Sequence, residues 1–435
     1  MPYQPCSVGS VAPTVDTPIV DACVQSTNSL LADVIGERPT GGEKGACRIA
    51  RLIEEDLISS GWATGTACPS EQSIAKRFGT GRSSVRGAVR ILEVRGVARM
   101  IPGPKGGLRV LGLDSEHTIG AVVGFARFLG TGTAELDEAR DALERVRQNA
   151  SDAAGIGRDI GSQTDAILKF FASVLAAMVK ATEDTGSSAP RSSVLLAPDT
   201  LRRSRAGQIA GQMLGDFTVE QWVRGHRLGS EEDLCFRYGA DRDAFRQAVR
   251  ILESVGAAET LCGRGHGLVS KAPRAGSIAR LVSCLFASSS VHPTTVMSLF
   301  EHLSVEIIGL SAARAVASDC ALVRQSLDDL EVALDRQDAD SILGCVYDVE
   351  ETILGVCGNP LLRLFVQSLR GYPSARIPRD ALALTAMNQQ FLRSSRIILE
   401  TYEANDTTAA MAAQRARIAV IGEISRTLQT TDGHV

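Results

Sequence analysis

The chain has 435 residues, of which 44% are hydrophobic and 22% are charged; this suits two to four packed domains and argues against a fibrous or wholly disordered protein. Arg outnumbers Lys by 40 to 6, which favours planar anionic partners such as phosphates and carboxylates. Apolar stretches are interrupted long before they could span a membrane, and residues 1–10 lack the features of a secretion signal. The ten Cys form no CxxC pair, which fits reduced thiols in a cytoplasmic protein. We therefore predict a cytoplasmic protein with no membrane partner.

The first 43 residues are rich in Pro, Thr, Ser and Gly and are predicted to form a disordered tail. Residues 44–112 then show the pattern of three helices and a hairpin. The first helix stops before Gly61, the second follows the potential N-cap Ser70, and the third spans about residues 82–95. Short strands over 97–100 and 108–111 flank a turn rich in Gly and Pro. This order predicts a winged helix-turn-helix.

The same unit recurs further along the chain. Sliding the chain without gaps until Arg82 falls on Arg242 also places Arg86 on Arg246. Further pairs at this shift are Ser70-Glu71 with Ser230-Glu231, Ala88 to Glu93 with the identical run Ala248 to Glu253, and Gly107-Leu108 with Gly267-Leu268. Chance does not produce so many matches at one shift. We predict an internal duplication, with a second winged helix-turn-helix over residues 202–272.

The remaining chain has helical periodicity. Residues 113–183 hold about three helices, including one over 135–149, and residues 184–201 read as a linker. Residues 273–430 hold six or seven helices and are predicted to form an all-α domain. The predicted fold is mostly α with small β-wings: two winged helix-turn-helix domains plus all-α helical effector-type domains.

The charges are distributed unevenly among these parts. Residues 44–112 contain 12 Lys and Arg against 5 Asp and Glu, a balance of +7, whereas residues 202–272 contain 11 against 9. The rest of the chain carries −13. A basic module on an acidic body is typical of nucleic-acid binders, and the two units are not electrically equal.

Basic side chains of the first unit lie on one helix face. Arg82, Arg86 and Arg90 recur every four residues, opposite the apolar positions, with Ser83 and Ser84 near the helix start. Guanidinium and hydroxyl groups at a helix N-terminus match phosphate oxygens and guanine edges in a major groove. On the wing, Lys105 and Arg109 are placed to reach the DNA backbone or the minor groove. The alternative interpretation is an ordinary solvated charged face.

The run Pro69-Ser70-Glu71-Gln72-Ser73-Ile74-Ala75, followed by Arg82-Ser83-Ser84-Val85-Arg86, resembles the DNA-binding signature of GntR-type transcriptional regulators. That resemblance implies DNA contacts by Arg82, Ser84 and Arg86, with Gln72 standing where the family usually has a contacting Arg. In the second unit it implies contacts by Arg242 and Arg246 and, on the wing, by Arg264. Glu232, Asp241 and Asp243 stand beside them, so weaker binding is expected there.

The helical parts resemble the effector domain of the FadR-like subgroup. Glu138-Ala139-Arg140 is similar to its opening, and Gly358-Asn359-Pro360 to its Gly-Asn-Pro turn. Many members bind a divalent metal through one Asp and three His; here those positions fall on Val346, Glu350, Ser395 and Arg417, so no metal is expected. Two alternatives remain: Arg417 and Arg396 bind an anionic effector near Glu350, or Arg417 forms a buried structural pair with Glu350. The stretch 113–183 is half the family's length and is expected to serve as spacer and dimer surface.

Other chemistries have little support in the sequence. The six His form no HxxH, HExxH or His–Cys spacing, and no GxSxG nucleophile elbow occurs. We predict no enzyme activity, no cofactor and no metal.

The predicted function is that of a transcriptional repressor that binds double-stranded DNA and is controlled by a small organic acid. The chain is expected either to form a homodimer or to act as an internal pseudo-dimer. The alternative is a protein-interaction scaffold with degenerate winged-helix modules.

Overall fold

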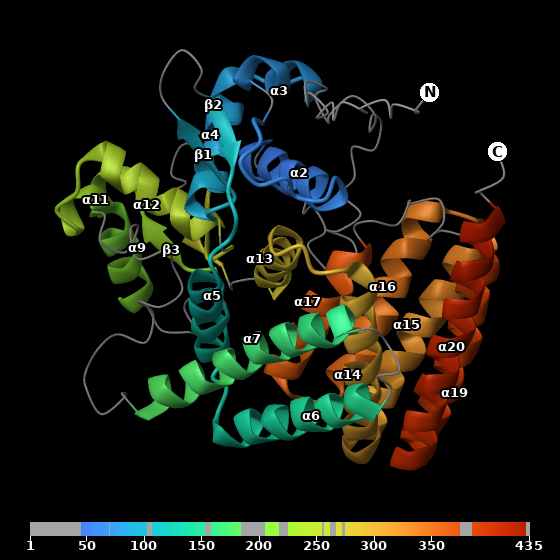
Figure 1. The fold of residues 1–435 in the computed structure, drawn as a ribbon. Coiled ribbons are helices and arrows are strands. Elements are labelled where there is room, and N and C mark those ends of the chain that lie inside the picture. The colour runs from blue at the N-terminus through green and yellow to red at the C-terminus, as the bar shows by residue number, and fades with distance from the viewer. Residues whose placement is uncertain are drawn as a thin grey trace, which may run out of the picture.

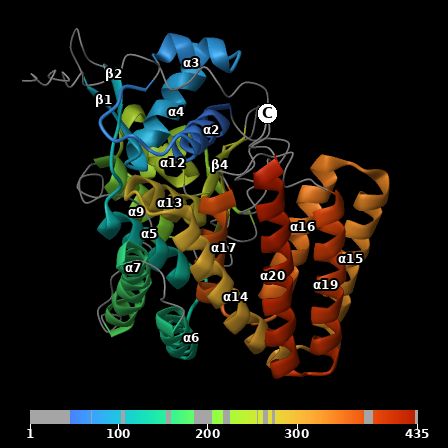
Figure 2. The ribbon, with the colours of Figure 1, turned by 45° about the vertical axis from the view of Figure 1, so that its right-hand side comes forward.

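The structure is a computed structural model that describes residues 45–68, 70–101, 107–152, 158–183, 205–216, 225–254, 256–261, 267–271, 275–374 and 385–431. The predicted tail 1–43 and linker 184–201 lie outside the described residues. Two small helix–sheet units lie together at one end of the molecule, and the remaining helices form the other end (Figures 1 and 2). Helices dominate and the sheets are small, as predicted.

The first module, residues 44–112, contains α2 (Gly45–Ser59), α3 (Glu71–Arg77), α4 (Arg82–Val94), β1 (Ala98–Ile101) and β2 (Gly107–Val110). Ser70 caps α3, since its Oγ accepts a hydrogen bond from the Ser73 amide at 3.1 Å. Val85, Ala88 and Leu92 of α4 are buried, and β1 pairs antiparallel with β2 to form the wing. The order of elements is that of a winged helix-turn-helix.

Gly87 lets α2 and α4 approach each other closely. A Cβ at this position would lie 2.8 Å from the Cβ of Ala46 in α2, so Gly87→Ala forces the two helices apart and is expected to lower the free energy of unfolding by about 1–3 kcal/mol. Gly120 in α5 (Ser115–Phe128) is the matched control, because its Cβ would meet nothing within 4 Å. Gly120→Ala is expected to raise stability by about 0.5–1 kcal/mol. Thermal denaturation measures both changes, and a Gly87→Ala variant as stable as Gly120→Ala would contradict the steric explanation.

Residues 202–272, called here the second segment, repeat this order with α9 (Arg205–Gly215), α11 (Glu231–Arg237), α12 (Arg242–Ser254), β4 (Ala258–Thr260) and β5 (Leu268–Ser270). Helices α11 and α12 begin at the positions that the sequence repeat pairs with the starts of α3 and α4. One strand was not predicted from the sequence: β3 (Arg227–Gly229) pairs with β5 and makes a three-stranded sheet. At the equivalent place in the first module, Ala67 and Arg109 form only an isolated bridge. A strand of three residues with one apolar position shows no alternation of apolar and polar residues from which it could be predicted.

The helical parts follow each module. Residues 113–183 contain α5, α6 (Thr133–Asp152) and α7 (Arg158–Glu183), the three helices predicted there. The C-terminal part contains seven helices among the residues that the structure describes: α13 (Ala275–Ser288), α14 (Pro293–Arg314), α15 (Ala317–Arg336), α16 (Ala339–Gly355), α17 (Pro360–Ser374), α19 (Thr385–Glu403) and α20 (Thr407–Thr431). Helix α14 packs against six helices: α6, α7, α16, α17, α19 and α20.

Helix α14 is long and apolar enough to cross a membrane by length and composition, the one such helix found among the described residues. Most of its apolar window is buried inside the protein. Its hydrophobic side chains, Val296, Leu299, Leu303, Ile307 and Ile308, belong to the core. Packing against six other helices therefore accounts for its composition.

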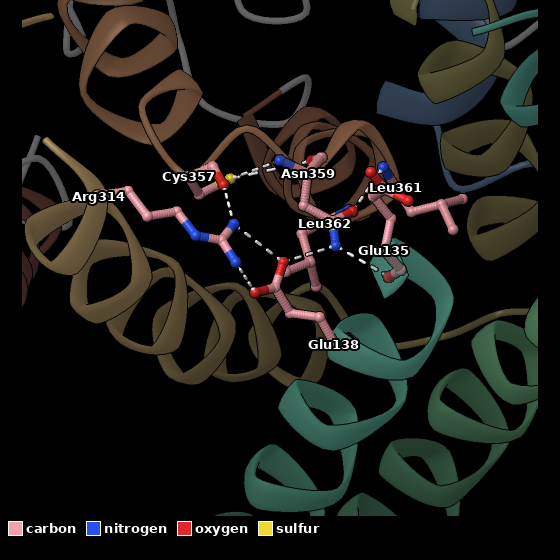
Figure 3. Close-up of polar contacts among 7 residues, drawn as sticks. All are labelled: Glu135, Glu138, Arg314, Cys357, Asn359, Leu361 and Leu362. Atoms are coloured by element: carbon pink, nitrogen blue, oxygen red, sulfur yellow. Dashed lines mark hydrogen bonds and ion pairs between the residues drawn. The ribbon is translucent and has the colours of Figure 1, made fainter. Parts of the chain in front are cut away.

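The two helical parts are joined by a polar junction between α6, α14 and α17 (Figure 3). The side chain of Asn359 accepts hydrogen bonds from the amides of Leu361 and Leu362 at the start of α17, at 3.1 and 3.2 Å. Its Nδ2 donates to the Glu135 carbonyl and to the Glu138 carboxylate of α6, both at 2.9 Å. Arg314 of α14 pairs with the same Glu138. One buried asparagine thus caps a helix and holds a second helix that is distant in the sequence.

Candidate nucleic-acid interface

The basic stripe on α4 is exposed on the side away from the core. Arg82, Ser83, Arg86 and Arg90 are exposed, Ser84 is half-buried, and Val85 and Val89 on the opposite face are buried. Gln72 on α3 is also exposed. The helix starts at Arg82 and has no side-chain cap at Gly81. The Ser84 amide donates to the Gly81 carbonyl at 3.1 Å, so the amides of Arg82 and Ser83 are the ones that can donate to an anion. The arrangement suits phosphate and base-edge contacts from one surface.

Two of the side chains predicted to contact DNA are held by intramolecular contacts. The Arg86 guanidinium lies 3.6 Å from the carboxylate of Glu71 on α3, an exposed and loose pair. Arg109, predicted to reach DNA from the wing, instead donates to the Gly65 carbonyl at 3.2 Å, so its guanidinium braces the base of the wing. Lys105 lies outside the described residues.

The second segment presents a more acidic surface. Arg242 and Arg246 are exposed, but Arg246 donates to both carboxylate oxygens of Glu231, at 3.1 and 3.3 Å. Glu231, Glu232 and Asp233 form the first turn of α11. Hydrogen bonds from Ser230 hold the pKa of Asp233 below its usual value, so this carboxylate stays charged. The Phe236 side chain is 91% exposed on the same helix, and Arg264 lies outside the described residues.

A buried carboxylate connects the first module to the C-terminal helices. Glu54 of α2 accepts two hydrogen bonds from Arg95, at 2.9 and 2.7 Å. Arg280 of α13 lies 4.0 Å from the same carboxylate, and both residues are buried. This polar contact therefore connects α13 directly to α2, and α2 packs on α4.

The predicted effector residues do not lie together. Arg417 is buried and pairs with Glu350 at 2.8 Å, while its other guanidinium nitrogen donates to the Ser395 hydroxyl at 2.9 Å. Arg396 is 43% exposed and pairs with Glu331 on α15 at 2.6 Å. The grouping of Arg396 with Arg417 is corrected accordingly, because the two neighbouring positions 395 and 396 point about 100° apart around a helix. Of the two alternatives, the buried Glu350–Arg417 pair is present.

The residues at the family's metal positions do not fit a divalent cation. The Arg417 guanidinium is a permanent cation 2.8 Å from Glu350, the single carboxylate of the four positions, and Arg370 lies 3.4 Å from its other oxygen. Among the described residues, no three His, Cys, Asp or Glu side chains lie close enough together to hold a metal.

Comparison with known families matches two parts of the chain. Residues 46–106 match the bacterial regulatory proteins of the gntR family, and residues 296–419 match the FCD domain. These two matched regions are called here, by their similarity, the gntR-family domain and the FCD domain. No curated protein matches it.

Solved structures that resemble the chain each cover about half of it. GntR of Streptococcus agalactiae is 20% identical with a TM-score of 0.38, over 51% of this chain and 99% of that one. McbR/YncC of E. coli is 16% identical with a TM-score of 0.28, over 51% and 98%. A third structure is described by the words that Lar controls the expression of the Listeria monocytogenes agr system and mediates virulence. It is 14% identical with a TM-score of 0.28, over 52% of this chain and 98% of that one.

The gntR-family domain implies DNA binding and the FCD domain implies small-molecule binding. Together they support a DNA-binding transcriptional regulator with a ligand-binding C-terminal domain. The gntR-family match covers the first module alone, so a second winged helix-turn-helix in the second segment remains a prediction.

Three arginines of the structure were not predicted from the sequence. Arg370 joins the buried pair beside Glu350, and no motif singles it out. Arg99 and Arg250 line a cavity between the gntR-family domain and the second segment. Arg250 could have been found, since the sequence repeat pairs it with Arg90.

Proposed function

We propose that the protein is a sequence-specific transcriptional repressor whose first module reads DNA through α4. The observation that carries this proposal is the exposed set Arg82, Ser83 and Arg86 at the start of α4, opposite a buried apolar face. These side chains and the free amides at the helix start can contact phosphates and base edges together. No catalytic step, cofactor or metal belongs to the proposal, and the protein acts in the cytoplasm.

We further propose that one chain imitates the dimer formed by two ordinary regulators, so that the second segment is a degenerate second module. Helices that begin at equivalent positions of the repeat pack against each other in three pairs: α4 with α12, α5 with α13, and α6 with α14. A twofold dimer interface has this character, because the same surface is used on both partners. Figure 1 places α4 and α12 side by side at the end of the molecule that holds both units. The asymmetry of charge then favours an asymmetric DNA site read mainly by the first module.

The FCD domain is the proposed effector domain, as in the FadR-like subgroup, with an organic acid as effector. Binding there would move α13, and the contact of Arg280 with Glu54 carries that movement to α2 and so to α4. The effector would lower DNA affinity by changing how the first module is held.

Titration of the full chain onto the DNA upstream of its own gene, at two salt concentrations and with the stoichiometry measured by mass, tests the proposal. We expect tight, sequence-selective binding that weakens steeply with salt, because basic side chains displace counterions from phosphates. One chain per site would support the internal pseudo-dimer, and two chains would support a homodimer. Absence of sequence preference, with and without organic acids, would favour the protein-interaction scaffold. The observation that supports this alternative is the exposed apolar side chain of Phe236 on the acidic helix α11.

A further inference from the structure

A cavity of about 350 Å³ lies between the first module and the second segment. Its walls come from the C-terminal half of α4, from β1 and from the chain that leads into α5 on one side, and from α9 and α12 on the other. The volume lies at the lower end of the range of about 300–1,000 Å³ typical of small-molecule sites. It is separate from the buried Glu350–Arg417 pair in the FCD domain.

Basic side chains dominate this cavity. Arg90, Arg95, Arg99 and Arg250 line it, against the two carboxylates Glu93 and Asp114. Both carboxylates already accept backbone hydrogen bonds: Glu93 from the Met100 amide at 3.0 Å, and Asp114 from the Glu116 amide at 3.1 Å. Arg95 is fixed by its two hydrogen bonds to Glu54.

The other three arginines have no partner within the described part of the chain. Arg90, Arg99 and Arg250 form no hydrogen bond or ion pair there. Arg90 and Arg250 stand at equivalent positions of α4 and α12, so the contact between these helices brings the two side chains to one cavity. The cavity lining therefore has more arginines than carboxylates, and a bound anion would relieve the repulsion among the unpaired guanidinium groups.

We propose that this cavity binds a small multivalent anion carrying phosphate or carboxylate groups, held between the two units by Arg90, Arg99 and Arg250. The occupant is a small anion and not a DNA duplex, because about 350 Å³ is the volume of a small-molecule site. The bound anion would clamp α4 to α12 and so fix the separation of the two units. This last step rests on the proposed function, whereas the anion site itself does not.

The first experiment measures anion binding to the full chain without DNA, by calorimetry at constant ionic strength so that general screening does not change. Pyrophosphate and citrate are the probes, and they distinguish phosphate from carboxylate recognition. Arg250→Ala and Arg99→Ala are each expected to weaken binding by about tenfold or more, the effect of a lost charge-assisted hydrogen bond. Arg393→Ala is the matched control, since Arg393 is an exposed arginine of α19, a helix that does not line this cavity. The Arg393→Ala variant is expected to bind the anion as tightly as the unchanged chain does. Arg90 is left intact because it also belongs to the proposed DNA surface.

The second experiment measures DNA affinity with and without the anion that binds. We expect the anion to change the affinity of the unchanged chain by about 5- to 150-fold, the usual range for coupled sites, and to have no effect on Arg250→Ala. Failure of both anions to bind, or equal binding to the unchanged chain and to both variants, would overturn the anion site. Anion binding without any change in DNA affinity would overturn the clamp alone. A chain that binds the anion through these arginines but binds no DNA would retain the site and refute the proposed function.

Discussion

Replacing both Arg82 and Arg86 by Ala is expected to cause a large loss of sequence-selective DNA binding by the full chain. Both side chains project from the exposed face of α4 and contribute nothing to the core, so the fold should be retained. Each arginine that reads a base edge is worth about 1–3 kcal/mol of specific binding, so the double change is expected to weaken it by about 30-fold or more. Fluorescence anisotropy with the upstream DNA measures the loss, and circular dichroism checks the fold.

The matched control for this experiment is the pair Arg242→Ala and Arg246→Ala in the second segment. Arg246 is already bound to Glu231, and the acidic first turn of α11 repels phosphates, so a clearly smaller loss is expected. Equal losses in the two double variants would contradict the asymmetry and indicate that both units read DNA alike. No loss in either would favour the protein-interaction scaffold.

Removing one partner of the buried pair in the FCD domain is expected to give the largest change in stability. The side chains of Arg417 and Glu350 are 2% and 9% exposed, and Arg417→Met leaves the Glu350 carboxylate with only the more distant Arg370. A buried charge that loses its partner costs about 3–5 kcal/mol. Urea unfolding followed by far-ultraviolet circular dichroism, which reports the helices, measures this loss of unfolding free energy.

Two further variants separate the charge effect from a packing effect. Arg417→Met combined with Glu350→Met is expected to recover much of the stability, because a buried ion pair can be replaced by apolar side chains of similar volume at little cost. Arg396→Met, in an exposed pair with Glu331, is expected to cost less than about 1 kcal/mol. A loss at Arg417 as small as that at Arg396 would contradict the buried pair.

Local features of the chain could be predicted well from the sequence. The spacing of Val85, Ala88 and Leu92 defines the core face of α4, and the arginines every four residues then have to lie on the other side. Ser70 is the predicted cap of α3 and acts as one. These features depend on residues within one or two helical turns, so the spacing of side chains contains the information needed.

Other features depend on segments that meet only in the folded chain. The Asn359 side chain donates a hydrogen bond to Glu138 on a helix far away in the sequence. Arg396 pairs with Glu331 on α15, whereas the neighbouring Ser395 accepts a hydrogen bond from Arg417. Arg99 and Arg250 line one cavity between two units. Periodicity tells which face of a helix is buried, but not which partner covers it or at what angle. The sequence by itself therefore determined most of the helices and the basic face of α4. Only the tertiary structure decided which charges are paired and which remain free for a ligand, because those pairings follow from the packing of helices distant in the chain.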